Sequence, residues 1–186
     1  MKKWFAILAA VCMMWQIAPM YSDAATIKSG ADYVPSKNYF YEIYFNDSYN
    51  SSTMAVKCSG PVSQRECTNP NGGYTHLYRN HYLSLGIASS DYFLMEDYYF
   101  PMKSNTIYTI SSEDEYGEPY KYKYTVLNVN MTKKVGNRTY KHIIRIKNNA
   151  SNGYTYIAKN HGVILITYKQ NGKQKIFYKV KNYTRR

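Results

Sequence analysis

The residues best suited to catalysis lie between positions 76 and 81, where His76 and His81 flank Tyr78 and Arg79. An imidazole can act as a general acid or base and an arginine can bind a phosphate, so this set would suit the phosphodiester chemistry of a secreted nuclease or toxin. However, two histidines in a polar stretch are more often solvated than catalytic. The chain has no G-x-S-x-G, H-E-x-x-H or phosphate-binding glycine motif. We therefore expect a non-enzymatic protein without a cofactor and retain the nuclease as an alternative.

Cys58 and Cys67 are the cysteines that remain once an N-terminal leader is removed. In an oxidising exterior we expect them to form a disulfide, which loop closure would make worth about 2 to 3 kcal/mol. A metal site would add His76 and His81, but the spacing does not match the close-set ligand pairs of structural zinc sites. The acidic stretch 113–118 could bind a hard cation, yet it fits no calcium loop, and we favour a solvated hairpin tip. We expect no metal.

Charge is distributed unevenly along the chain. Residues 119–186 contain sixteen Lys and Arg and no Asp or Glu, whereas all twelve acids of this +12 protein lie earlier. Such an asymmetry attracts polyanions and makes their binding depend on salt. Lysines on exposed strands also oppose aggregation and favour solubility, but neither effect requires acids to be excluded from so long a stretch. The candidate polyanion-binding residues are Lys141, Arg145, Lys147, Lys175, Lys179 and Lys181.

Residues 1–25 have the pattern of a secretory signal peptide. Lys2 and Lys3 precede the apolar run 4–14, and small residues follow at 22–24. A membrane anchor is the alternative, but Gln16 and Pro19 interrupt the run short of the roughly 18 residues that span a bilayer. A lipoprotein would need Cys12 at the end of the run. We expect a mature monomer of residues 26–186, without a transmembrane segment, forming a single β-rich domain.

The mature chain is rich in short runs of Tyr, Ile, Val and Thr separated by Asn, Gly and Ser, a pattern typical of β-strands. The clearest hairpin joins 163–170 to 173–182 through Asn171 and Gly172, which tolerate positive φ. In its second strand, alternation predicts Ile176, Tyr178 and Val180 inside and lysines outside. Further strands are expected at 39–44, 83–87, 106–110, 120–130, 139–147 and 154–159, and a short helix is conceivable at 88–97. The predicted fold is all-β and mainly antiparallel: a twisted sheet, a sandwich or an open half-barrel.

A short motif occurs twice. Residues 33–41 (YVPSKNYFY) match 99–108 (YFPMKSNTIY) once one position is skipped. Each copy reads as an extended entry containing Pro, a turn at Asn and an aromatic strand at a sheet edge. We expect two related halves, 26–95 and 96–186; chance similarity in a chain rich in Tyr and Lys is the alternative.

These segments resemble a family of uncharacterised secreted proteins and lipoproteins of Gram-positive, Bacillus-like bacteria, with YFPLKxGNxW, TYKxxI and YYAKGVGLV segments. Residues 99–105 (YFPMKSN), 139–144 (TYKHII) and 156–164 (YIAKNHGVI) are similar to these segments and follow in the same order. Ser104, Ile107, Asn160 and His161 depart from the family pattern. The resemblance implies an exported β-rich envelope protein and transfers no active site.

Three classes of function follow. The first is an exported, non-enzymatic cell-envelope protein, secreted and associated with the cell wall, whose basic sheet contacts anionic wall polymers or lipid headgroups. The second is a β-sheet module that binds a small apolar or sugar ligand. The third is the secreted nuclease or toxin.

Export provides the first test. Cleavage between about Ala24 and Thr26 should leave a protein whose intact mass begins near residue 26, because the small residues at 22–24 suit signal peptidase. Mass spectrometry of exported protein checks this prediction. Retention of the first 24 residues would contradict it.

Overall fold

The computed structural model describes residues 25–46, 51–79, 81–89, 92–113 and 119–186. Within these ranges the chain forms fourteen strands and one short 3-10 helix. The first half contains β1 (Thr26–Ile27), η1 (Ala31–Tyr33), β2 (Tyr39–Asn46), β3 (Ser51–Ser59), β4 (Gln64–Asn69), β5 (Gly72–Arg79), β6 (Tyr82–Ser89) and β7 (Tyr92–Tyr99). The second half contains β8 (Met102–Lys103), β9 (Thr106–Glu113), β10 (Pro119–Val135), β11 (Arg138–Asn148), β12 (Tyr154–Ala158), β13 (Gly162–Gln170) and β14 (Lys173–Arg185).

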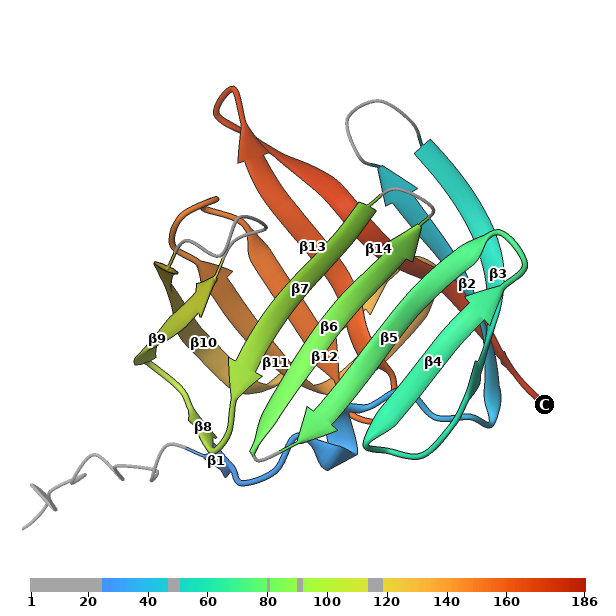
Figure 1. The fold of residues 1–186 in the computed structure, drawn as a ribbon, viewed down its shortest axis with the longest axis horizontal. Coiled ribbons are helices and arrows are strands. Elements are labelled where there is room, and N and C mark those ends of the chain that lie inside the picture. Colours follow the sequence, from blue (N-terminus) through green and yellow to red (C-terminus); the bar gives the residue numbers. More distant parts are fainter. Residues whose placement is uncertain (1–24, 47–50, 80, 90–91, 114–118) are drawn as a thin grey trace, which may run out of the picture.

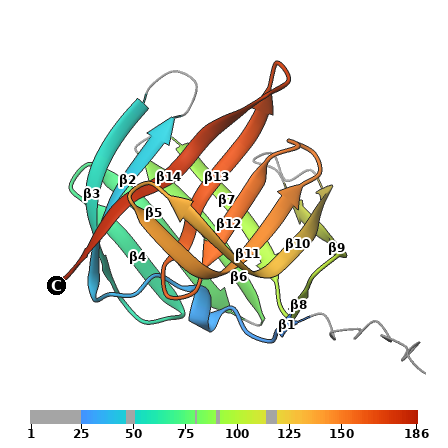
Figure 2. The same cartoon turned by 180° about the vertical axis from the view of Figure 1, so that it is seen from behind.

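Twelve strands form one antiparallel, nearly closed twisted sheet, and β1 pairs with β8 in a small second sheet. Strands β2 to β7 are neighbours in chain order, as are β9 to β14. The two six-stranded meanders are joined where β2 pairs with β14, from Tyr39–Arg185 to Phe45–Tyr178. Twist brings β4–β7 opposite β10–β14, as the two opposite views show (Figures 1 and 2). The predicted all-β antiparallel fold is confirmed.

The large sheet stays open between its edge strands β7 and β9, and two tyrosine side chains of β10 link β10 to β7 across this gap. The Asp97 backbone N–H donates to the Tyr122 hydroxyl at 3.2 Å, and the Tyr99 N–H donates to the Tyr124 hydroxyl at 2.8 Å. A free strand edge exposes a row of unpaired backbone groups. These hydroxyls therefore satisfy donors on β7 that a neighbouring strand would otherwise pair.

Alternation along the strands places one set of apolar side chains inside. Ile43, Leu85, Ile146 and Val180 are each at most 1% exposed and belong to four different strands. Cys58 and Cys67 lie directly opposite each other on β3 and β4 and form the expected disulfide. Because both sulfurs are bonded to each other, they are not available as the thiolate ligands that the metal alternative required.

Several local predictions can be compared with the structure. The 171–172 turn is confirmed, with φ of 50° at Asn171 and 77° at Gly172. The helix suggested at 88–97 is wrong, because this stretch lies in strands β6 and β7 with residues 90–91 outside the described ranges. The acidic stretch 113–118 lies largely outside these ranges as well. The two motif copies run into the first residues of β2 and β9, the first strand of each meander. The common origin of the halves stays a prediction.

The β10–β11 hairpin tip lies against β14. The Asn137 N–H donates to the Lys181 carbonyl at 2.9 Å, and Arg138 donates from Nε to Asn182 Oδ1 and from Nη2 to the Tyr183 carbonyl, both at 2.9 Å. Gly136 permits this approach, because a Cβ there would stand 2.2 Å from the Lys181 carbonyl oxygen. The tip thus links the β10–β11 hairpin to β14, which is not next to either strand in the sheet.

A pair of glycine substitutions tests this packing. Gly136 and Gly172 both have positive φ, 57° and 77°, but nothing lies within 4 Å of a Cβ at Gly172. Gly172→Ala should cost only the left-handed backbone penalty of about 1 to 2 kcal/mol, whereas Gly136→Ala should cost about 1 to 3 kcal/mol more through overpacking. Urea unfolding of both variants measures the difference. Equal losses of unfolding free energy in the two variants would contradict the packing of this tip against β14.

Candidate functional site

The acid-free segment of the sequence becomes a continuous part of the surface. Strands β10 to β14 are five adjacent strands, all drawn from residues 119–186, so none of them carries a carboxylate side chain. The first acid beyond β14 is Glu42 on β2, which pairs with Lys181 at 2.7 Å. We call the outward side of these five strands the basic face (Figure 2).

A cross-strand row forms the centre of the basic face. Ladder pairs connect Arg145, Tyr156, Leu165, Lys179 and Tyr44 across β11, β12, β13, β14 and β2. The Arg145 guanidinium lies over the Tyr156 ring, 5.9 Å from its centroid, and the Lys179 ammonium lies 5.4 Å from that of Tyr44. Such cation–π contacts hold a cation in place without neutralising its charge.

Other cations extend the row. Arg145 also lies over Tyr154, at 4.4 Å, and Lys133 Nζ is 5.0 Å from the Tyr156 ring centroid. Lys147 pairs with Thr125 on β10 and with Tyr154 on β12, which places it on the same face. By the same alternation, the exposed Lys123 and Lys169 face outward from β10 and β13. The sequence analysis did not single out Lys123, Lys133 or Lys169.

The six predicted cations do not form one uniform row. Lys141 is exposed, and Arg145, Lys147 and Lys179 lie on the basic face as described. Lys175 is exposed near the β13–β14 turn, and the register shifts between Ile166 and Thr167, so the alternation on β14 is interrupted between Lys175 and Lys179. A second shift near Lys181 leaves that side chain paired with Glu42.

These shifts also explain an error in the predicted alternation. Tyr178 and Val180 are fully buried as expected, but Ile176 is 36% exposed. A bulge reverses which side of the strand faces the core. The alternation therefore holds only C-terminal to the bulge, from Tyr178 to Val180.

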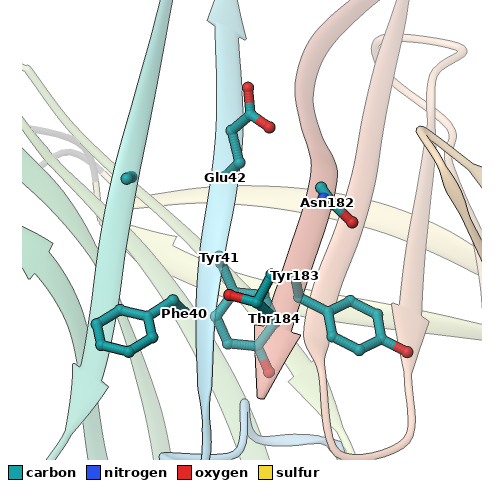
Figure 3. Close-up of a pocket in the computed structure, with 7 residues that line it drawn as sticks. Phe40, Tyr41, Glu42, Asn182, Tyr183 and Thr184 are labelled. Carbon is teal, nitrogen blue, oxygen red and sulfur yellow. The ribbon is translucent and has the colours of Figure 1, made fainter. Parts of the chain in front are cut away.

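A shallow pocket of about 250 Å³ lies where β2 pairs with β14. Figure 3 shows Tyr41 and Tyr183 on the two adjacent strands, with Phe40 pointing away from them. Glu42 is the charged residue of the lining and is already paired with Lys181. This charge makes the pocket a poor site for an anion. Its lining residues are Phe40, Tyr41, Glu42, Ala55, Asn182, Tyr183 and Thr184.

The two histidines of the nuclease hypothesis are in different environments. His76 is fully buried and its Nε2 accepts a hydrogen bond from the Val163 N–H at 3.2 Å. Burial, and secondarily the charge of Arg65, lowers the pKa of His76 to about 3. His81 is exposed in the turn between β5 and β6. The structure thus does not present both imidazoles on one accessible surface, as an acid–base pair requires.

The interior contains polar groups that the sequence analysis missed. Arg65 is only 6% exposed, although alternation with the buried Cys67 on the same strand could have indicated its inward direction. Its ladder neighbour is His76. On the opposite side of the interior, the Tyr98 hydroxyl donates to Glu96 and is 3.1 Å from Thr155 Oγ1, while burial raises the pKa of Glu96.

Among the described residues, no group of three or more His, Cys, Asp or Glu side chains is arranged to hold a metal ion. No helix in the described ranges has the length and apolar character needed to cross a membrane. No protein-family model, curated protein or solved structure matches this chain.

Burial of His76 predicts a pH dependence of stability. Its pKa lies below the ordinary 6.5, so the unfolded chain binds a proton that the folded chain refuses, and stability should fall as pH drops below 6.5 toward 3. The free energy of unfolding should therefore depend less steeply on pH in His76→Gln, by about 1 kcal/mol per pH unit between about pH 6 and pH 5. Urea unfolding across this range measures it. The exposed His81→Asn serves as the control, and equal slopes in the wild type and His76→Gln would contradict the burial.

Proposed function

We propose that this protein is an exported, non-enzymatic cell-envelope protein that binds a polyanion through its basic face. The observation that carries the proposal is the adjacency of β10 to β14, which combines their cations on a surface to which these strands contribute no carboxylate. Such a surface concentrates a phosphate-bearing polymer and binds it by releasing its counterions.

The contacts on this surface support binding more than solubility alone. Arg145 and Lys133 lie across the rings of Tyr154 and Tyr156, so their charges are held above a flat aromatic surface. Solubility requires no fixed cation positions, whereas a polymer benefits from cations that lose little side-chain entropy on binding. Tyr154 is only partly buried, so its ring also offers a surface on which a sugar or base can stack, whereas Tyr156 is buried beneath the cations.

Export and wall location complete the proposal. The leader-like residues 1–25 and the Cys58–Cys67 disulfide fit an oxidising exterior. The resemblance to Gram-positive secreted proteins suggests wall teichoic acids or anionic lipid headgroups as the nearest polyanions. The protein would then be retained at the cell surface by charge and released by salt.

A triple substitution tests the basic face. Replacing Lys147, Lys169 and Lys179 by Gln should leave the fold intact, because all three lie on the outward side. Each lost contact lowers the slope of log K against log salt by roughly 0.7 to 0.9. In the triple variant this slope should therefore be smaller in magnitude by about 2. Binding to a poly(glycerol phosphate) chain at several salt concentrations gives both slopes.

The matched control replaces Lys28, Lys37 and Lys57, which are exposed and lie outside β10 to β14. It removes the same charge, so a uniform effect of net charge would weaken both variants equally. The proposal requires a loss of slope in the first variant and little change in the second. Equal slopes for the two variants would show that the basic face only keeps the protein soluble.

A further inference from the structure

The interior of the sheet contains a group of buried polar atoms without well-formed hydrogen bonds. Among the described residues, seven buried side-chain atoms make no hydrogen bond of good geometry, and the Arg145 Nε is the one that belongs to the basic face. The other six come from strands β4, β5, β11 and β14, and we call them the interior donor cluster. They are Arg65 Nε, Arg65 Nη1, Tyr74 Oη, His76 Nδ1, Tyr140 Oη and Tyr178 Oη.

These atoms are close to one another. Arg65 and His76 are ladder partners, and the Tyr74 ring centroid lies 5.3 Å from that of His76 and 5.4 Å from that of Tyr178. Tyr140 is an electrostatic neighbour of both Tyr74 and Tyr178. The cluster therefore draws on strands from both meanders and exists only in the assembled sheet.

Every member of the cluster is suited to donate. The Val163 N–H occupies His76 Nε2, so the neutral ring must carry its proton on Nδ1. Burial raises the pKa of Tyr74, Tyr140 and Tyr178, which keeps these phenols protonated. The Arg65 guanidinium adds donors and has no acceptor. The phenol oxygens can also accept, and the Tyr74 and Tyr178 hydroxyls bond to each other, but Arg65 and His76 Nδ1 can only donate. A buried unpaired cation is costly.

The described residues supply no carboxylate for this cation. None lies within 4.0 Å of the Arg65 guanidinium as an ion pair. Glu96 shares the inward row Arg65–His76–Leu85–Glu96, but it is three strands away, about 14 Å at the usual strand spacing. It is also already bonded to Tyr98.

We propose that the interior donor cluster is a binding site for the oxyanion group of a small ligand, either a carboxylate or a phosphate. An arginine fork and converging hydroxyl and imidazole donors match an oxyanion, which offers several acceptor lone pairs and the missing negative charge. This site faces the interior and goes beyond the polyanion binding proposed for the outer surface. The two sites share no residue, so a small ligand and a polymer would not compete.

Thermal unfolding of the mature protein tests the site. Acetate and inorganic phosphate are each compared with chloride at equal ionic strength near neutral pH, with circular dichroism as the readout. At a hundredfold excess over Kd, the effective oxyanion should raise Tm by about 5 to 10 °C. Arg65→Met should abolish this shift, while its Tm in chloride should be equal to or above that of the wild type, because it removes an unpaired buried charge.

Two further variants keep the test decisive. Tyr140→Phe removes one donor atom and preserves the ring, so oxyanion affinity should fall about 3- to 10-fold even if Arg65→Met folds poorly. Arg79→Met removes an exposed arginine from the end of β5 and should keep the full shift. A shift with acetate alone identifies a carboxylate, and one with phosphate alone a phosphoryl group. No shift with either anion, or equal shifts in the wild type, Arg65→Met and Tyr140→Phe, would overturn the proposal.

Discussion

The pairing of β2 with β14 is the interaction on which the rest of the structure depends. It joins residues near the start of the mature chain to the C-terminal strand, from Tyr39–Arg185 to Phe45–Tyr178. Every other ladder in the large sheet joins strands that are consecutive in the chain and belong to one meander. Without this pairing the two meanders would be separate sheets. Such a long-range contact carries the largest loop-closure cost in the molecule.

The two candidate sites depend on the architecture in different ways. The basic face depends on chain order, because a meander turns the acid-free segment 119–186 into five neighbouring strands bounded by Glu42 on β2. The interior donor cluster depends on assembly, since Arg65 and Tyr74 come from the first meander and Tyr140 and Tyr178 from the second. The outer surface thus collects cations at or near water, where a charge without an ion-pair partner costs little. Among the described residues, the interior holds the Arg65 guanidinium and the His76 imidazole N–H, which need an acceptor.

Local sequence patterns predicted much of the second meander and less of the first. Asn171 and Gly172 fix their turn through backbone sterics alone, and the strands around them lie as expected. Strands β3, β4 and β5 were missed because polar residues such as Ser51, Gln64 and Thr75 interrupt the apolar pattern. The bulges that separate Lys175 from Lys179 and expose Ile176 arise from pairing with β13, which no single strand encodes. The inward direction of Arg65 conflicts with its charge, and only its neighbours in the sheet determine it.

Amide chemical shifts during titration with a poly(glycerol phosphate) chain test the central claim most directly, because they map the contact surface residue by residue. Binding through the basic face predicts that the largest changes lie in β10 to β14, around Arg145, Lys147 and Lys179, and that they disappear as salt is raised. Changes centred on β4 to β6, or spread evenly over both meanders, would contradict the account.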